Sequence, residues 1–565
     1  MDDKRTLLGL LLIGLIFLLS PYYYEWMGLS PKPEGPSEQD SAETQQQAAE
    51  KVPVESNPPQ RLEQPLQVLT EEEKPAGNEL GQASGAALSS RREDIPTFTP
   101  RTVAVQTPLL DLALSTQGGT IQSAFLQQYT LPDDGRPVQL IAPQRSGLTV
   151  RLQQIDAVED LSRIQFEPSR EKLVVNEGQG TLIMRAQLGG NRVIEKVFTF
   201  YADRYAFDLE LRYAGFSEEF DVLLGWQGGI PFTESAPDSD LPEMGAIATF
   251  NNERIEIKVD NGERDSWDAE GDLHWIGARS KYFLSAIIPT EQARYRAELR
   301  GDRTGSSPIP NYSYEIGRQL SSSGSWKNTV YLGPLNYDNL IRYEVGLEQA
   351  IDFGWPVIRS VSKFLLIAFK ATHTYIPNYG WIIVLFAVVI KIIVYPLTHK
   401  TYESAGKMQE LQPKIAALRE KYKNDSQRLS QETMKLYKEE GVNPISGCLP
   451  MFLQMPIFFA LYNVFSKTIE LRQAPFALWI NDLSMPDEVL VGGFGLHILP
   501  LLMAVSMLIQ QKMTMKDPKQ AFLVYFMPVL MIFFFWTMSS GLVLYWTLFN
   551  VLTIGQQVLV NHLKK

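Results

Sequence analysis

An apolar run at residues 380–396 (GWIIVLFAVVIKIIVYP) constrains this chain more than any other segment. Its length is close to the roughly 20 residues that an α-helix needs to cross a hydrocarbon core. Lys391 lies inside the run, where a charge costs roughly 2.5–3.5 kcal/mol and usually faces a wet cavity or a polar partner. Because Lys391 lies about 7–8 Å from Pro396 along a helix, its ammonium can either extend to the headgroups or line a hydrated groove inside the protein.

Charge divides the chain into two unlike parts. Residues 351–565 hold 20 Lys and Arg against 13 Asp and Glu, whereas residues 6–350 hold 30 against 49. A basic membrane-embedded part and an acidic soluble part on opposite sides of a bilayer explain this division. The single cysteine excludes an internal disulfide and a cysteine-based metal site. The sequence contains no HExxH, Walker A or dinucleotide-binding glycine motif, so we expect no metal, no cofactor and no enzyme activity.

Residues 1–27 predict an N-terminal transmembrane anchor. An apolar run at 7–19 follows Lys4 and Arg5, and an aromatic stretch typical of a membrane interface comes next. A cleaved signal peptide is the alternative, but no small-x-small cleavage site follows the run. Residues 28–95 are rich in Pro, Glu, Gln and Ser and nearly free of aromatic residues, which predicts a disordered tether.

Alternating apolar and polar residues begin after the tether. Segments such as 102–106 and 207–213 alternate strictly, and turns rich in Gly and Asp separate them. This pattern predicts many antiparallel strands with one buried face, and we expect residues 96–335 to form a large exported β-sandwich. Its tryptophans could bind sugar or peptide. No acid pair or nucleophile accompanies them, which favours a structural or docking role.

The remainder predicts an interfacial helix followed by membrane spans. Residues 336–376 contain a linker and an amphipathic helix in which cationic residues punctuate apolar ones. Five spans follow, near 379–397, 443–465, 495–511, 521–536 and 542–560. Basic residues concentrate in the inner loops and the C-terminal tail, so with the anchor we expect six spans and both termini inside the cell. Several of these spans are short for a hydrocarbon core of about 30 Å.

Residues 399–443 predict a cytoplasmic helical hairpin between two spans. Apolar residues follow a heptad-like spacing from Met408 to Tyr422, and Asp425 is suited to cap a second helix. Pro413 predicts a kink or a helix restart. The hairpin is either a soluble connection or a docking site for a partner. The predicted fold is therefore an α-helical polytopic membrane protein with six spans, an exported all-β domain and this hairpin.

Several motifs resemble the YidC/Oxa/Alb family of membrane protein insertases. Residues 470–484 read ELRQAPFALWINDLS, and 443–450, 454–458 and 540–546 read NPISGCLP, QMPIF and SGLVLYW. The order of spans matches this family over about 353–562. The anchor, the tether and the motif WIGARSKYF at 275–283 resemble its Gram-negative bacterial branch.

The resemblance implies a function and partners. Family members insert and fold nascent membrane proteins in the bacterial inner membrane, alone or beside the Sec translocon. They meet the ribosome and the signal recognition particle or its receptor through the hairpin, contact membrane lipids, and do not bind nucleic acid by sequence. The resemblance also implies a periplasmic β-supersandwich and an insertase core at 377–565, whose helices enclose a hydrophilic groove.

The same resemblance implies site residues. Lys391 occupies the place of a groove cation that is commonly arginine, and lysine keeps the charge without the planar five-donor fork. Gln454 and Gln511 are candidates for wetting the groove. A substrate slide is expected at the residues that match the family motifs by position: Met455, Phe458, Phe534, Tyr545 and Trp546. Apart from the resemblance, apolar residues at these positions are equally consistent with ordinary helix packing.

Two other classes of function are compatible with parts of the sequence. A transporter also places a charge at mid-depth, but it is expected to show repeated halves or paired broken helices, and the chain has none in its sequence. An intramembrane serine protease needs a Ser–His pair, for which Ser539, Ser540 and His497 are candidates. The glycine expected two residues before the nucleophile is absent from the sequence around these serines.

Overall fold

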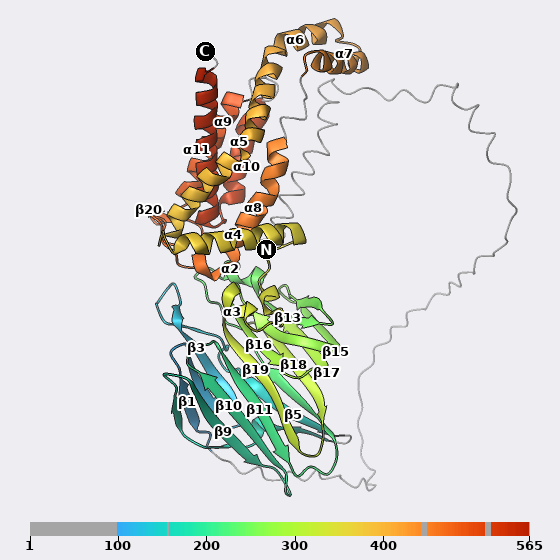
Figure 1. Cartoon of the computed structure of the whole chain (residues 1–565), viewed down its shortest axis with the longest axis vertical. Helices are drawn as coiled ribbons and strands as arrows, with labels where there is room; N and C mark the ends of the chain where they lie inside the picture. Colours follow the sequence, from blue (N-terminus) through green and yellow to red (C-terminus); the bar gives the residue numbers. More distant parts are fainter. Residues whose placement is uncertain (1–98, 155–156, 442–448, 515–520, 564–565) are drawn as a thin grey trace, which may run out of the picture.

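A computed structural model describes residues 99–154, 157–441, 449–514 and 521–563. The described chain forms a β domain followed by a helical bundle, which lie end to end along the long axis of the molecule (Figure 1). The predicted anchor and tether lie outside the described residues.

The β domain consists of two sheet layers that share one long strand. In the first layer β8, β1, β2, β3, β5, β12, β18, β17 and β15 pair in that order, and in the second the order is β7, β9, β10, β11, β19, β16, β15, β13 and β14. The strands are β1 Thr102–Gln106, β2 Leu110–Ser115, β3 Thr120–Thr130, β4 Pro137–Gln139, β5 Gly147–Gln154, β6 Ala157–Asp160, β7 Glu167–Pro168, β8 Lys172–Val174, β9 Gln179–Gln187, β10 Val193–Tyr201, β11 Ala206–Ala214, β12 Phe220–Trp226, β13 Gly245–Phe250, β14 Glu253–Ile257, β15 Arg264–Arg279, β16 Phe283–Pro289, β17 Arg294–Asp302, β18 Asn311–Leu320 and β19 Gly324–Pro334.

Alternation of buried and exposed residues explains why these strands form two packed layers. In β10, for example, Phe198 and Phe200 are fully buried and lie on one face, as the period of two requires. Tyr295 of the first layer stacks on Trp326 of the second, with ring centroids 6.3 Å apart. The predicted β-sandwich is therefore present. Trp226 and Trp275 are fully buried in it and present no surface to a sugar or peptide.

The helical part follows a short linker. Its helices are α3 Tyr337–Ile341, α4 Pro356–His373, α5 Tyr379–Glu410, α6 Gln412–Lys421, α7 Ser426–Glu439, α8 Leu449–Lys467, α9 Ile498–Thr514, α10 Ala521–Phe535 and α11 Ser540–Leu563. The short helix α2 Pro237–Asp240 belongs to the β domain, and 3-10 turns occur at η1 Leu161–Arg163, η2 Leu241–Glu243, η3 Leu347–Ala350 and η5 Ile469–Leu471.

Helix α4 is the predicted amphipathic helix. It lies across the boundary between the β domain and the bundle (Figure 1). Leu366 and Phe369 are buried, and the Phe369 ring contacts Phe465 of α8 at 5.5 Å. Phe364 and Ile367 are exposed on the opposite face. This arrangement suits a helix that lies in the plane of a membrane surface.

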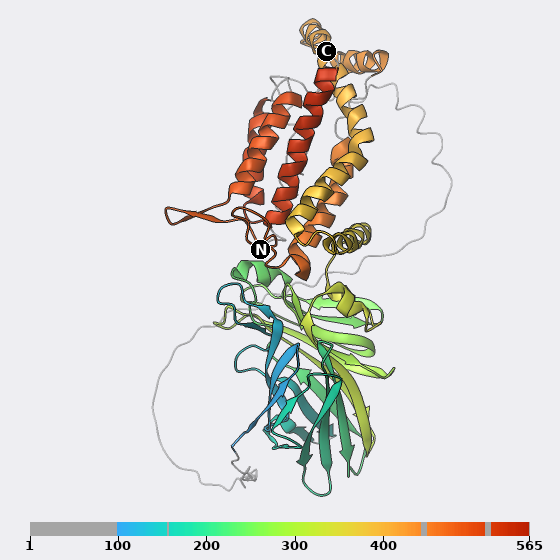
Figure 2. The ribbon, with the colours of Figure 1, turned by 60° about the vertical axis from the view of Figure 1, so that its left-hand side comes forward.

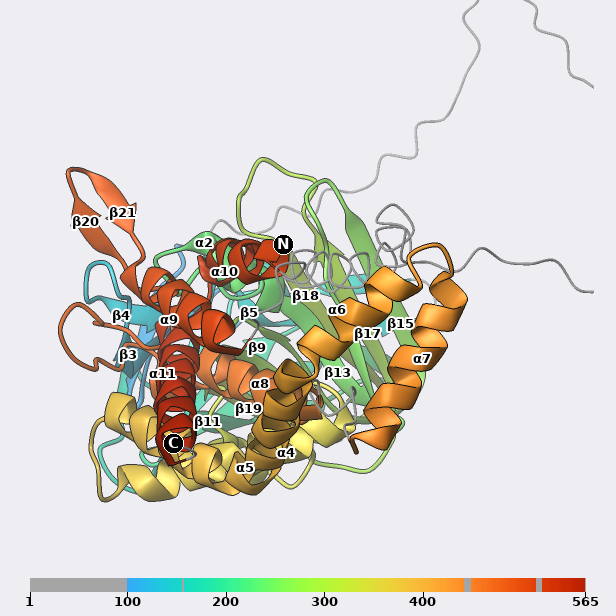
Figure 3. The same cartoon turned by 90° about the horizontal axis from the view of Figure 1, so that it is seen from above.

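The hairpin forms as two helices at the end of the bundle that is remote from the β domain (Figure 1), and seen from above these helices lie to one side of α9 and α11 (Figure 3). Helix α6 restarts directly after α5, with Pro413 in its first turn, where proline is tolerated. The Asp425 carboxylate caps α7 by accepting from the backbone N–H of Arg428. Leu411 and Ile415, which belong to the heptad-like series of apolar residues, are buried against α7. The apolar contact expected between the two helices is therefore present.

Two helices in the described part of the chain are long and apolar enough to cross a membrane, Tyr379–Pro396 of α5 and Ser540–Val560 of α11. Ile498–Met513 and Val524–Phe535 are shorter apolar helices. The six-span count therefore stays a prediction.

One predicted span boundary was wrong. The span expected from residue 495 begins at Ile498, because strands β20 Val489–Val491 and β21 Phe494–Leu496 precede it. Gly492 and Gly493 have positive φ and close this hairpin, a conformation that glycine adopts without a Cβ penalty. The β20–β21 hairpin extends sideways from the end of the bundle that adjoins the β domain (Figure 2).

Candidate functional site

Lys391 is turned into the bundle. Its side chain is buried, with 8% of the residue exposed. Its ammonium donates to the Thr553 hydroxyl of α11 at 2.6 Å and lies 4.6 Å from the centroid of the Phe549 ring. The ammonium therefore has partners on the neighbouring helix α11. In this structure it does not extend along α5 toward the lipid headgroups, which was the other arrangement compatible with the sequence.

Further polar side chains lie between α11 and its neighbours α5 and α9. Gln556 of α11 donates to Thr398 of α5 at 3.4 Å, and Asn550 of α11 donates to Ser506 of α9 at 3.3 Å. Asn550, Thr553 and Gln556 are spaced by three residues and share one face of α11. This polar face was not predicted, although polar residues at this spacing in an apolar helix are a signal that the sequence carries.

Two glutamines in this interior have unsatisfied oxygens. The side-chain oxygens of Gln511 and Gln556 are buried and accept no hydrogen bond from any described residue. Buried polar atoms are normally satisfied, and water is the usual partner where the protein supplies none. Lys391 and Gln556 both lie at the interface of α5 and α11, where they present a buried cation and a buried acceptor oxygen.

Two of the predicted slide residues, Phe458 of α8 and Trp546 of α11, are in contact, and Phe535 of α10, next to the predicted Phe534, packs against both rings. The Phe458 ring packs edge-on against Trp546 at 5.1 Å, and Phe534 contacts Phe535 at 5.3 Å. Met455 is 38% exposed. Gln454 donates to the Tyr545 hydroxyl at 3.1 Å, and Tyr545 is fully buried. In this structure Tyr545 is therefore a packing residue of the bundle, and its side chain has no exposed surface that a substrate could contact.

The serine and histidine candidates do not meet. The Ser540 hydroxyl donates to the Asp482 carbonyl at 2.7 Å, and the Ser539 and Ser466 hydroxyls lie 3.4 Å apart. Nδ1 of His497 contacts the Asp487 carbonyl instead. The described residues contain no cluster of three His, Cys, Asp or Glu that could hold a metal.

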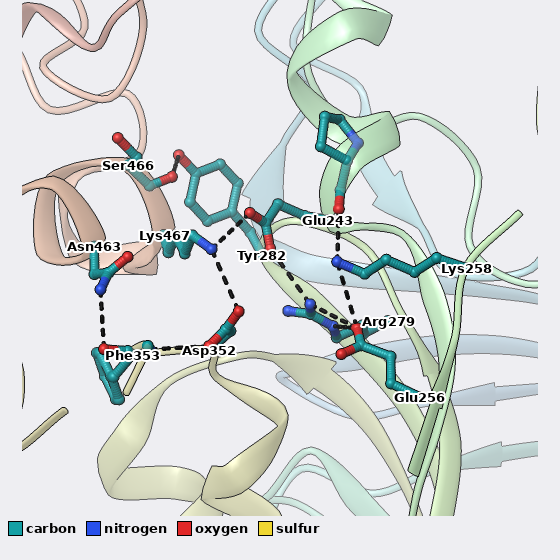
Figure 4. Close-up of polar contacts among 12 residues, drawn as sticks. Glu243, Glu256, Lys258, Arg279, Tyr282, Asp352, Phe353, Asn463, Ser466 and Lys467 are labelled. Carbon is teal, nitrogen blue, oxygen red and sulfur yellow. Dashed lines mark hydrogen bonds and ion pairs between the residues drawn. The ribbon is translucent and has the colours of Figure 1, made fainter. Parts of the chain in front are cut away.

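A buried ionic network joins the β domain to α8 (Figure 4). The Lys467 ammonium lies 2.8 Å from Glu243 and 3.6 Å from Asp352. Arg279, at the end of β15, lies 2.8 Å from Glu256 and 3.4 Å from Glu243. Burial alone would raise the pKa of Glu243, but the charges of Lys467 and Arg279 hold it well below its ordinary value.

A second ionic contact joins the outer segment after α8 to the β domain. Arg472 is buried, and its Nε donates to a Glu234 carboxylate oxygen at 2.7 Å. Its Nη2 donates to the carbonyls of Thr130 and Thr233 at 2.9 and 3.0 Å. The planar guanidinium can donate to these three acceptors at once. The ammonium of a lysine, on its flexible stem, is less suited to such an arrangement. Each domain thus supplies charges that the other neutralises.

Acid should loosen this junction. The pKa of Asp352 is also lowered, because Lys467 and a backbone N–H outweigh the effect of burial. Below the ordinary carboxylate pKa near 4.5 the unfolded chain binds more protons than the folded one, so stability falls as pH decreases. We expect the protection factors of the backbone amides of Glu243 and Asp352, which correct for the intrinsic exchange rate at each pH, to fall below about pH 4.5.

The Glu243→Gln variant provides the control for this acid effect. It should show weaker pH dependence, because one of the two titrating carboxylates is absent. A wild-type junction equally protected at pH 3 and pH 7 would contradict the assignment.

Comparison with known proteins decides the family. Residues 371–565 match the family described as 60Kd inner membrane protein, and residues 102–368 match the YidC periplasmic domain. A membrane protein insertase YidC from Syntrophus aciditrophicus is 33% identical, with 99% of both chains covered. The chain belongs to the YidC family of membrane protein insertases. YidC proteins from Prosthecochloris aestuarii and Pelobacter propionicus are 32% and 34% identical, with 99% and 85% of this chain and 94% and 90% of those proteins covered.

A crystal structure of an active YidC insertase with its first transmembrane domain resolved is 19% identical and has a TM-score of 0.35, covering 81% of this chain and 93% of that chain. A putative aldose 1-epimerase from Escherichia coli K12 is 9% identical with a TM-score of 0.28, covering 42% of this chain and 99% of that chain.

Membership of the YidC family has three direct consequences. The β domain is a periplasmic domain and the helical bundle is the membrane part. The protein is an inner-membrane protein. YidC proteins are insertases and not enzymes, so the chain is not an enzyme.

Proposed function

We propose that this chain inserts nascent proteins into the inner membrane through a groove centred on Lys391, alone or with the Sec translocon, and helps them fold. The observation that carries the proposal is the polar interior of the bundle, where Lys391 and the unsatisfied oxygens of Gln511 and Gln556 are buried between α5, α9 and α11. Membership of the YidC family supports the same function.

The mechanism follows from the cost of moving polar groups through lipid. An unpaired polar group in an apolar medium costs roughly 2–7 kcal/mol, and a hydrated groove shortens the dry distance that a translocated segment must cross. The Lys391 charge attracts acidic residues of that segment. For an acidic tail, a membrane potential that is positive outside contributes about 2.3 kcal/mol per charge per 100 mV.

The apolar segment of the substrate leaves through the slide. Met455, Phe458 and Trp546 provide apolar contacts between the groove and lipid, and burial releases about 25 cal/mol per Å² of apolar surface. Nucleotide hydrolysis is not needed. Six spans place both termini and the α6–α7 hairpin in the cytoplasm, where the hairpin meets the ribosome and the signal recognition particle or its receptor.

Site-specific photocrosslinking tests the function. A photoreactive residue at position 455, 458 or 546 should crosslink to a ribosome-stalled membrane protein, because these positions form the proposed exit path. Position 174, exposed on strand β8 of the periplasmic domain, is the matched control. Equal crosslinking from position 174, or none from the three slide positions, would contradict the proposal.

Deleting most of the periplasmic domain should leave insertion largely intact. A chain without residues 97–330, with the anchor joined to the core, should retain at least about half of wild-type insertion, because all proposed groove and slide residues remain. Insertion of a radiolabelled substrate into vesicles measures the effect. Complete loss in a stably expressed deletion would show that the periplasmic domain takes part in insertion itself.

A further inference from the structure

A cavity of about 360 Å³ lies between the periplasmic domain and helices α4, α8 and α10. Its two ends differ in chemistry. The helices contribute an apolar end, and the periplasmic domain together with the end of α8 contributes a polar end. The apolar end is lined by Phe458, Phe459, Phe534 and Met538, and the polar end by Ser239, Glu243, Lys258, Lys281, Asp352 and Lys467.

The cations at the polar end are not equivalent. Lys467 is committed to Glu243 and Asp352, and Lys258 donates to the Pro242 carbonyl at 2.8 Å. Lys281 is only 8% exposed, and none of the described carboxylates lies within ion-pair distance of its ammonium. Its ammonium therefore makes no ion pair with the described residues, although it lies 5.0 Å from the centroid of the Tyr282 ring and Glu234 and Asp240 act on it at longer range.

The surroundings of Lys281 keep it charged. Burial would lower the pKa of Lys281, but Tyr282, Glu234 and Asp240 hold it above its ordinary value. Glu234 itself is bound to Arg472. The Ser239 hydroxyl, also in the cavity lining, is buried and has no hydrogen-bond partner among the described residues. The polar end thus holds a cation and a hydroxyl donor that can both bind an anion.

The cavity lies at the level of the outer membrane surface. Trp355, which precedes α4, lines the cavity and is 80% exposed. Helix α4 continues from it with exposed apolar residues such as Val357 and Phe364, as expected of a helix in the membrane interface. The apolar end is formed by residues of α8 and α10. A molecule in the outer leaflet can therefore place an acyl chain against these helices and its headgroup against the periplasmic domain.

From these observations we propose that the cavity binds the headgroup of an anionic phospholipid from the outer leaflet, with its phosphate at Lys281 and Ser239 and an acyl chain along Phe459 and Phe534. A zwitterionic lipid is disfavoured, because both carboxylates of the lining, Glu243 and Asp352, are already paired with Lys467 and none is left for the lipid's ammonium. A volume of about 360 Å³ is within the range of roughly 300–1,000 Å³ that is usual for small-molecule sites. The site is distinct from the groove at Lys391, shares Phe458 and Phe534 with the proposed slide, and couples the periplasmic domain to lipid.

Photoaffinity labelling of the unaltered full-length protein tests the site. The protein is reconstituted in nanodiscs with phosphatidylglycerol that carries a diazirine in one acyl chain, and labelled peptides are identified by mass spectrometry. We expect labelling at peptides that contain Trp355 and Phe459, at least fivefold above that with the matched phosphatidylcholine probe. Equal labelling by the two probes, or removal of the label by millimolar glycerol phosphate, would overturn the proposal.

Variants locate the charge that is responsible. Lys281→Met should reduce phosphatidylglycerol labelling at these peptides about tenfold, and Lys281→Arg should keep most of it. Ser239→Leu fills the polar end without removing a charge and should also reduce labelling, which keeps the test valid if Lys281→Met folds poorly. Lys172→Met, on exposed strand β8, is the matched control. Unchanged labelling in both Lys281→Met and Ser239→Leu would refute the site.

Discussion

Replacing Lys391 with alanine should reduce insertion of substrates with acidic translocated tails about tenfold, since the loss of about 1.4 kcal/mol of attraction is a factor of ten in an equilibrium. The ammonium is buried beside Thr553 and Phe549, where an interaction with a carboxylate is screened less than at a surface. Insertion into vesicles of one substrate with an acidic tail, and of the same substrate with a neutral tail, measures the effect.

Matched variants separate charge from packing. Lys391→Arg should retain activity, because it keeps the charge and can form two parallel hydrogen bonds with a carboxylate. Thr553→Val removes the hydrogen-bond partner of Lys391 while keeping the cation, and it should reduce insertion much less than alanine at position 391. If the alanine variant inserts both substrates as well as the wild type, Lys391 is not the groove cation.

Replacing Arg472 with methionine should undock the periplasmic domain locally. Removal of one partner from a buried ion pair costs roughly 3–5 kcal/mol, because the other charge stays buried without compensation. The change would leave Glu234 and the carbonyls of Thr130 and Thr233 without their shared donor. At 1.4 kcal/mol per tenfold change, the backbone amides of Thr233 and Glu234 should exchange at least about a hundredfold faster.

A double variant and a remote charge provide the controls for Arg472. Arg472→Met combined with Glu234→Gln should recover part of the lost protection, because the uncompensated carboxylate is gone. Arg101→Met removes an arginine whose ion pairs are exposed, and such pairs are worth about 0–1 kcal/mol, so exchange at Glu234 should not change. Equal exchange in Arg472→Met and wild type would show that the junction does not depend on this pair.

Local patterns in the sequence predicted much of the fold. Strict alternation identified the strands, and the spacing around Ile415 and the proline at 413 identified the hairpin and its restart. The β20–β21 hairpin was missed, because its residues are as apolar as those of the following span and a short apolar run does not distinguish strand from helix.

The partners of the key charges could not be predicted from the sequence. Arg472 is the only basic residue between positions 470 and 491, and nothing in that stretch indicates its partner Glu234, which lies 238 positions away. Lys391 and Thr553 are separated by 162 positions. Periodicity indicates which face of a helix is buried, but no local pattern specifies which distant side chain meets it. The resemblance to insertases named Lys391, yet only the structure supplies its partners.

The continuity of α5 has a mechanical consequence. At 1.5 Å per residue, its 32 residues extend about 48 Å, well beyond a hydrocarbon core of about 30 Å. The same helix therefore contains Lys391 near its middle and leads into the α6–α7 hairpin at its C-terminal end. Pro396, inside the helix, lacks the N–H that its neighbouring turn would use, and proline is where helices bend. A force applied at the hairpin would therefore reach α5 at a bend about 1.4 turns from Lys391.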